Sequence, residues 1–134
     1  MIPRKVVVDT DLLLSHVAAG GPSALRRLMS AAFCYTTVFH AIEAFGVCRT
    51  PKETAAVEDT MHALKILGLN AKSGKNIGML FTSSTKRRDL HALAAGVCIE
   101  SRLPLITGRP AVYRGIGGLE LLPVERALEL IGKA

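Results

Sequence analysis

Acidic and hydroxyl side chains stand just after several short apolar segments of this sequence, where strands of a sheet are expected to end. Others stand at the start of the helices that follow. The positions are Asp9 and Asp11, Thr37 and Glu43, Asp89, and Thr107. Because the carboxyl ends of parallel strands meet at one edge of a sheet, these side chains are expected to converge there although they are far apart in the chain.

Converging carboxylates repel one another unless a cation lies between them. Hard oxygen ligands without a cluster of Cys or His favour Mg²⁺ or Mn²⁺. Such an ion lowers the pKa of a bound water and neutralises a phosphodiester under in-line attack. The pattern therefore predicts a divalent metal site among the converging acids Asp9, Asp11, Glu43 and Asp89.

Each acid also has a structural alternative. Asp9 could cap a helix, and Asp89 could cap a helix or pair with a neighbouring arginine. Glu43 stands among apolar neighbours and needs a partner, which could be a metal or an arginine. An arginine or lysine between Asp9 and Glu43 would contradict the metal hypothesis.

Short apolar strands alternate with helical segments along the chain. This pattern predicts an α/β fold, a three-layer α/β/α sandwich with a central, mostly parallel sheet, in a single domain spanning residues 1–134. Strands are expected at 5–8, 31–36, 69–71, 104–107 and 119–122, and the longer helices at 51–67 and 87–101.

Composition limits the classes of protein that fit. The 134 residues carry 17 Lys and Arg against 11 Asp and Glu, a net charge of +6 that favours an anionic partner. With no Trp and only six aromatic residues, the chain is not expected to be a base-stacking platform of the single-strand-binding type. Three cysteines without CxxC spacing suit a reducing cytoplasm, and neither a signal peptide nor a membrane span is expected.

Four segments in order resemble PIN domains of the VapC-type toxin group. VVVDTDLLL resembles the first strand with its metal aspartate, and TTVFHAIEAFG the second strand and the helix with its glutamate. RRDLHALAAGVCIESRLPLIT resembles the helix with the third acid and the strand that ends in Thr. ITGRPAVYRGIGGLELLP resembles the closing loop, strand and helix.

The resemblance implies a metal-dependent endoribonuclease, the toxin of a toxin–antitoxin pair, acting on RNA as a homodimer that an antitoxin protein blocks. It places the catalytic and metal-binding roles on Asp9, Glu43 and Asp89, with Mg²⁺ or Mn²⁺ as cofactor. The supporting roles fall on Asp11, Thr37 and Thr107, and contacts with RNA phosphates on Arg87, Arg88 and Arg109.

Two positions depart from the family pattern. Arg109 stands where the family commonly has Asp or Asn, and the spacing back from Thr107 puts His91 at the place of the third acid, two residues after Asp89. Asp89 is the expected ligand because no other carboxylate is near. The departures motivate an alternative function, a degenerate PIN domain that binds RNA or a protein partner without cleavage.

Overall fold

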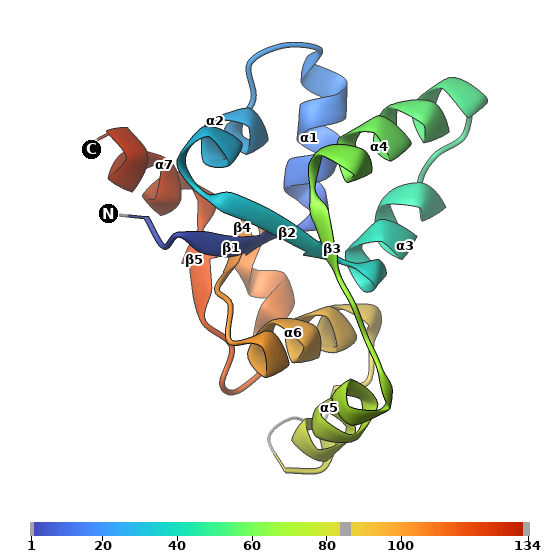
Figure 1. Cartoon of the computed structure of the whole chain (residues 1–134), viewed down its shortest axis with the longest axis vertical. Coiled ribbons are helices and arrows are strands. Elements are labelled where there is room, and N and C mark those ends of the chain that lie inside the picture. Colours follow the sequence, from blue (N-terminus) through green and yellow to red (C-terminus); the bar gives the residue numbers. More distant parts are fainter. Residues whose placement is uncertain (1, 84–86, 133–134) are drawn as a thin grey trace.

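The computed structural model describes residues 2–83 and 87–132 and alternates strands with helices (Figure 1). The strands are β1 (Lys5–Val8), β2 (Phe33–Thr37), β3 (Lys65–Leu67), β4 (Leu105–Thr107) and β5 (Leu121–Pro123). The helices are α1 (Thr10–Ala19), α2 (Ala24–Ala31), α3 (Val38–Gly46), α4 (Pro51–Ala63), α5 (Ala71–Ser83), α6 (Leu90–Ser101) and α7 (Val124–Gly132), with a 3₁₀ helix, η1 (Pro110–Tyr113).

The five strands form one sheet in the order β3-β2-β1-β4-β5, and every pairing is parallel. The β-branched triplet of β1 is completely buried at the centre, as its apolar run predicts. Val7 pairs with Tyr35 of β2 on one side and with Leu105 of β4 on the other. The predicted α/β class with a central parallel sheet is confirmed.

Two apolar clusters cover the two faces of the sheet. On one face Val6, Val8 and Ile106 pack against residues of α1, α2, α3, α4 and α7. On the other face Val7 and Leu105 pack against α6 and η1. In Figure 1, α1, α2 and α4 lie on one side of the sheet and α6 on the other, with α5 beyond α6. These are the three predicted layers.

Polar caps fix where several helices begin. Ser23, Thr37 and Thr50 each accept a hydrogen bond through the side-chain oxygen from the backbone N–H three residues later. No helix in the described ranges is long and apolar enough to cross a membrane.

The third strand does not lie where the sequence predicts it. The helix expected to continue to residue 67 ends at Ala63, and β3 covers Lys65–Leu67. Of the strand expected at 69–71, residues 69–70 form a loop and Ala71 begins α5. Leu64 has an extended backbone and is buried, which turns the chain back to the edge of β2. The pairing with β2 outweighs the helical preference of this segment.

Candidate functional site

The carboxyl edge of the sheet collects the side chains predicted to meet there. Asp9 follows β1 and is fully buried, and its Oδ1 accepts a hydrogen bond from the backbone N–H of Thr10 at 2.7 Å. The hydroxyl of Thr107, at the end of β4, donates to Asp9 Oδ2 at 2.7 Å. Glu43 reaches the same place from α3, as the contacts below show. The predicted convergence of Asp9, Glu43 and Thr107 is therefore present.

The guanidinium of Arg109 lies between the two carboxylates. Its Nε and Nη2 donate to Oδ2 and Oδ1 of Asp9, both at 3.0 Å. Its Nη2 and Nη1 donate to Oε1 and Oε2 of Glu43, at 2.6 and 3.4 Å. One arginine thus bridges the two acids and supplies the cation that their mutual repulsion requires.

The pKa shifts follow from this arrangement. Burial alone would raise the pKa of Asp9, but hydrogen bonds from Arg109 and Thr107 and the neighbouring His40 outweigh it and hold the pKa below its usual value. Glu43 behaves in the same way, since the hydrogen bond from Arg109 outweighs its partial burial. The pKa of Arg109 is raised, chiefly by its hydrogen bond to Asp9. Burial acts in the opposite direction, and the bond to Glu43 raises the pKa further. Both acids are therefore ionised and Arg109 is charged at neutral pH.

His40 and Tyr113 complete the buried side of the centre, and sequence reasoning assigned neither to it. His40 Nδ1 lies 2.9 Å from the hydroxyl of Thr37, and its Nε2 lies 3.2 Å from the hydroxyl of Tyr113 and 3.4 Å from Oδ1 of Asp9. Burial lowers the pKa of His40 to about 4, so the ring is neutral at pH 7. The predicted supporting residue Thr37 therefore orients an imidazole. The sequence feature that indicates a place for His40 at this centre is its position three residues before Glu43 on the same helix.

Asp89, the third expected ligand, contacts the start of α6 and Arg87, and its role as a metal ligand stays a prediction. Its Oδ1 caps α6 by accepting from the backbone N–H of Ala92 at 2.9 Å. Its Oδ2 accepts from Arg87 at 2.7 Å, and the side chain is half-exposed. A short carboxylate at this position satisfies free N–H groups of the helix, which fixes it at the helix start.

His91 takes the place expected for the third acid. Its Nε2 lies 3.0 Å from Oε2 of Glu43, and its ring packs edge-on against Tyr113 with the centroids 5.7 Å apart. The spacing from Thr107 had pointed to this position. The residue there is an imidazole rather than a carboxylate.

The remaining predicted residues also make internal bonds. Asp11 Oδ2 accepts from the backbone N–H of Gly108 at 2.9 Å, while its buried Oδ1 has no hydrogen-bond partner among the described residues. Burial, together with the charge of Asp9, raises the pKa of Asp11. Arg87 donates to the carbonyl oxygens of Val112 and Arg114, and Arg88 lies over the ring of Phe81, 5.1 Å from its centroid. A contact between these arginines and RNA stays a prediction.

The side chains present do not fit a divalent metal bound as the family pattern implies. Magnesium and manganese need a set of oxygen ligands around one point. Here a guanidinium engages Asp9 and Glu43, a histidine stands in the third position, and Asp89 is turned towards Arg87. Across residues 2–83 and 87–132, no group of three or more His, Cys, Asp and Glu is placed to hold a metal ion.

Comparison with known proteins identifies the fold. No protein-family model matches the chain, and no curated protein matches it. Among solved structures it is similar to DNA-bound VapBC from Salmonella typhimurium, at 15% identity and a TM-score of 0.75, over 92% of this chain and 99% of that one.

Two further solved structures have a similar fold. One is VapBC2 from Rickettsia felis, bound to a DNA fragment from its promoter, at 17% identity and a TM-score of 0.73, over 89% of this chain and 98% of that one. The other is PAE2754 from Pyrobaculum aerophilum, at 15% identity and a TM-score of 0.65, over the full length of both chains. The chain therefore has the VapC-type PIN-domain fold that the sequence resemblance predicts.

Proposed function

We propose that this protein is a toxin-type PIN domain that binds RNA or a protein partner without metal-dependent cleavage, because its own arginine closes the acidic centre. The observation that supports this proposal is the bridge from Arg109 to both Asp9 and Glu43. A cationic side chain between Asp9 and Glu43 is the arrangement that contradicts the metal hypothesis, and Arg109 is such a side chain.

The physical argument is competition for the same oxygens. Both oxygens of Asp9 and both oxygens of Glu43 accept hydrogen bonds from the guanidinium. A divalent ion would have to displace these bonds and leave the positive charge of Arg109 beside it. Separating a buried charge from its partner costs about 3–5 kcal/mol, and the second positive charge adds repulsion. We therefore expect Arg109 to stay bound to Asp9 and Glu43 in place of a metal ion.

The protein partner that we propose is an antitoxin. The similar structures from Salmonella typhimurium and Rickettsia felis are of VapBC, and a further similar structure is a toxin–antitoxin complex from Klebsiella pneumoniae, at 15% identity and a TM-score of 0.66. Exposed apolar side chains on α3, Val38 and Ile42, offer surface for such a partner or for a second copy in the predicted homodimer. We place the protein in the cytoplasm.

The competing function is the one that the family pattern implies, an endoribonuclease that uses Mg²⁺ or Mn²⁺. The convergence of Asp9 and Glu43 at the carboxyl edge favours it. In that case Asp9→Asn should lower a metal-dependent cleavage rate by removing a ligand.

Cleavage of a labelled single-stranded RNA, with millimolar Mn²⁺ or with a chelator, decides between the two functions. We expect the wild type and Asp9→Asn to show the same background rate in both conditions. A Mn²⁺-dependent rate in the wild type that Asp9→Asn abolishes would overturn our proposal and support the ribonuclease.

A further inference from the structure

Towards the amino ends of β1, β2 and β3, one face of the sheet carries a small strip of aromatic and basic side chains, of which Tyr35 is half-buried and the others are exposed. The strip consists of Lys5 on β1, Phe33 and Tyr35 on β2, and Lys65 on β3. The register pairs Lys5 with Phe33 and Tyr35 with Lys65. Since residues paired across parallel strands, and residues two apart on one strand, point to the same face, all four share one face of the sheet.

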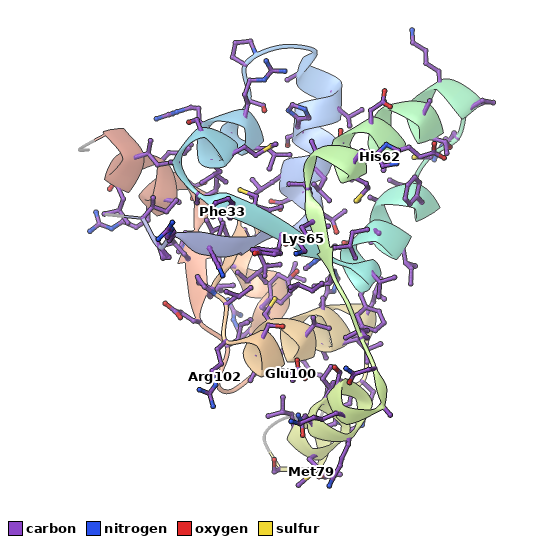
Figure 2. The ribbon with its side chains drawn as sticks, viewed as in Figure 1. Phe33, His62, Lys65, Met79, Glu100 and Arg102 are labelled. Carbon is purple, nitrogen blue, oxygen red and sulfur yellow. The ribbon has the colours of Figure 1, made fainter. Side chains whose placement is uncertain are left out.

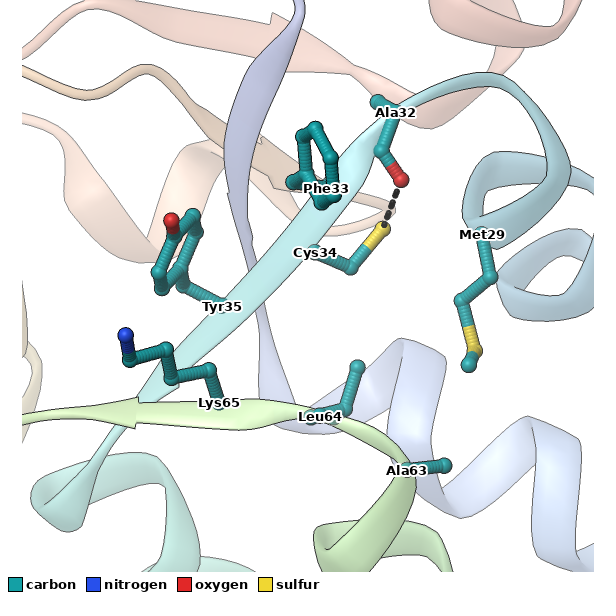
Figure 3. Close-up of a pocket in the computed structure, with 8 residues that line it drawn as sticks. All are labelled: Met29, Ala32, Phe33, Cys34, Tyr35, Ala63, Leu64 and Lys65. Carbon is teal, nitrogen blue, oxygen red and sulfur yellow. Dashed lines mark hydrogen bonds between the residues drawn. The ribbon is translucent and has the colours of Figure 1, made fainter.

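This face is only partly covered. Val7 and Leu105 lie under α6 and are fully buried, whereas Phe33, at the start of β2, is 59% exposed. Lys5 and Lys65 are exposed too. Figure 3 shows the rings of Phe33 and Tyr35 and the chain of Lys65 on one side of the strands, away from Cys34. Figure 2 shows where Phe33 and Lys65 lie on the whole molecule.

A hollow opens at the edge of the strip. β3 pairs with β2 only from Tyr35 onward, so Phe33 and Cys34 lie beyond its reach. The hollow measures about 320 Å³, and its lining includes Phe33, Tyr35 and Lys65 as well as Met29 and Leu64 (Figure 3). An extended ligand crossing the strip could therefore insert a flat group beside Phe33.

The charges of the strip select an anionic ligand. Lys5 and Lys65 are the charged residues that the five strands place on this face. Within the described part of the chain, neither lysine makes an ion pair. Two unpaired cations on either side of two aromatic rings match a ligand that alternates phosphates with flat bases.

We infer that the strip binds single-stranded RNA, with a base stacked on Phe33 and phosphates at Lys5 and Lys65. The hydroxyl of Tyr35 makes no hydrogen bond to any described residue, and it offers a partner for the ribose 2′-hydroxyl that DNA lacks. Composition alone argued against a base-stacking platform, and the sheet register changes that expectation because it brings Phe33 and Tyr35 together for a short contact. This inference names the ligand of the proposed binding function, yet it depends on none of the contacts of Arg109.

Fluorescence anisotropy with a labelled single-stranded RNA oligonucleotide tests the stacking contact. Phe33→Leu keeps an apolar side chain but removes the ring, so it should weaken binding about tenfold or more. Phe33→Tyr keeps the ring and should bind like the wild type. Matching thermal melts of the variants show that folding is unchanged. Equal affinities for the wild type and Phe33→Leu would overturn the inference.

The salt dependence of binding tests the two lysines. Lys65→Gln and Lys5→Gln should each reduce the slope of log K against log salt concentration by about 0.7, the value for one phosphate contact on a single strand. Lys52→Gln, which makes the same charge change on α4, should leave the slope unchanged. If Lys52→Gln and Lys65→Gln behave alike, binding reflects net charge alone and the strip is not the site.

Two further ligands test the class of partner. The wild type should prefer RNA to DNA of the same sequence, and Tyr35→Phe should remove that preference. Poly-glutamate should not displace the RNA at equal charge concentration. Equal affinity for DNA, or displacement by poly-glutamate, would overturn the assignment to RNA. Because none of these measurements involves a metal or Arg109, their failure would leave the account of the acidic centre standing.

Discussion

Two regions of the sheet differ in how their polar and charged groups find partners. At the carboxyl edge, Asp9 and Glu43 are joined by Arg109 and further held by Thr107 and His91. At the strip on the open face, Lys5 and Lys65 make no ion pair within the described residues, and Phe33 is largely exposed. The first region pairs Asp9 and Glu43 with an internal cation, whereas the second leaves its two lysines without an ion pair among the described residues.

The contrast matters because the predicted chemistry and the available surface lie in different places. A catalytic metal centre would keep carboxylates in need of a cation. In this chain the need is met internally, so the carboxyl edge contributes to folding and the strip to binding. Substitutions in the two regions should therefore have opposite effects, large on stability in one and large on ligand affinity in the other.

The largest expected effect on stability is that of replacing Arg109. Arg109→Met keeps the apolar stem but leaves Asp9 buried and ionised without its cation, so the free energy of unfolding should fall by about 3–5 kcal/mol. Urea denaturation at pH 7 measures it. Phe33→Leu in the strip should change the same quantity by less than about 0.5 kcal/mol. Similar losses for both variants would contradict the division into two regions.

The buried histidine gives a smaller and pH-dependent effect. The pKa of His40 is about 4 in the folded protein against about 6.5 in an unfolded chain, so between these values the unfolded state binds the additional proton. Stability should therefore fall as the pH drops from about 6.5 to 4, by up to about 1.4 kcal/mol per pH unit from this group.

Urea denaturation at pH 7, 6 and 5 measures this slope. His40→Gln, which cannot titrate, should flatten it relative to the wild type. His62→Gln, an exposed control on α4, should leave the slope as it is. A wild-type slope that His40→Gln does not change would show that His40 does not stay neutral inside the fold.

The sequence predicted the fold and the meeting of distant acids well, because both follow from apolar periodicity and parallel topology. The pairing of Asp9 with Arg109 was not predictable from local pattern, since it joins residues 100 positions apart. An arginine partner for Glu43 was one alternative, and Arg109 was identified as a cation at a position where the family has an acid or Asn, but its contacts with Asp9 and Glu43 were not predicted.

The start of α6 and the strand β3 were the hardest parts of the fold to predict, for different physical reasons. At the start of α6, a shift of two positions determines whether residue 89 or residue 91 faces Glu43. A metal site needs a carboxylate, which favoured Asp89 over His91. In the structure Asp89 caps α6, and His91 contacts Glu43. The strand Lys65–Leu67 was hidden because it continues a helical pattern, and only its pairing with β2 defines it.

The central claim, that Arg109 takes the place of a divalent ion, is tested most directly by calorimetric titration of Mn²⁺ into the purified protein. A matched variant, His91→Asp with Arg109→Asn, restores oxygen ligands at both departures and removes the internal cation. We predict no saturable Mn²⁺ binding to the wild type in the millimolar range and one-site binding to the variant. Saturable binding to the wild type that Asp9→Asn removes would contradict the account.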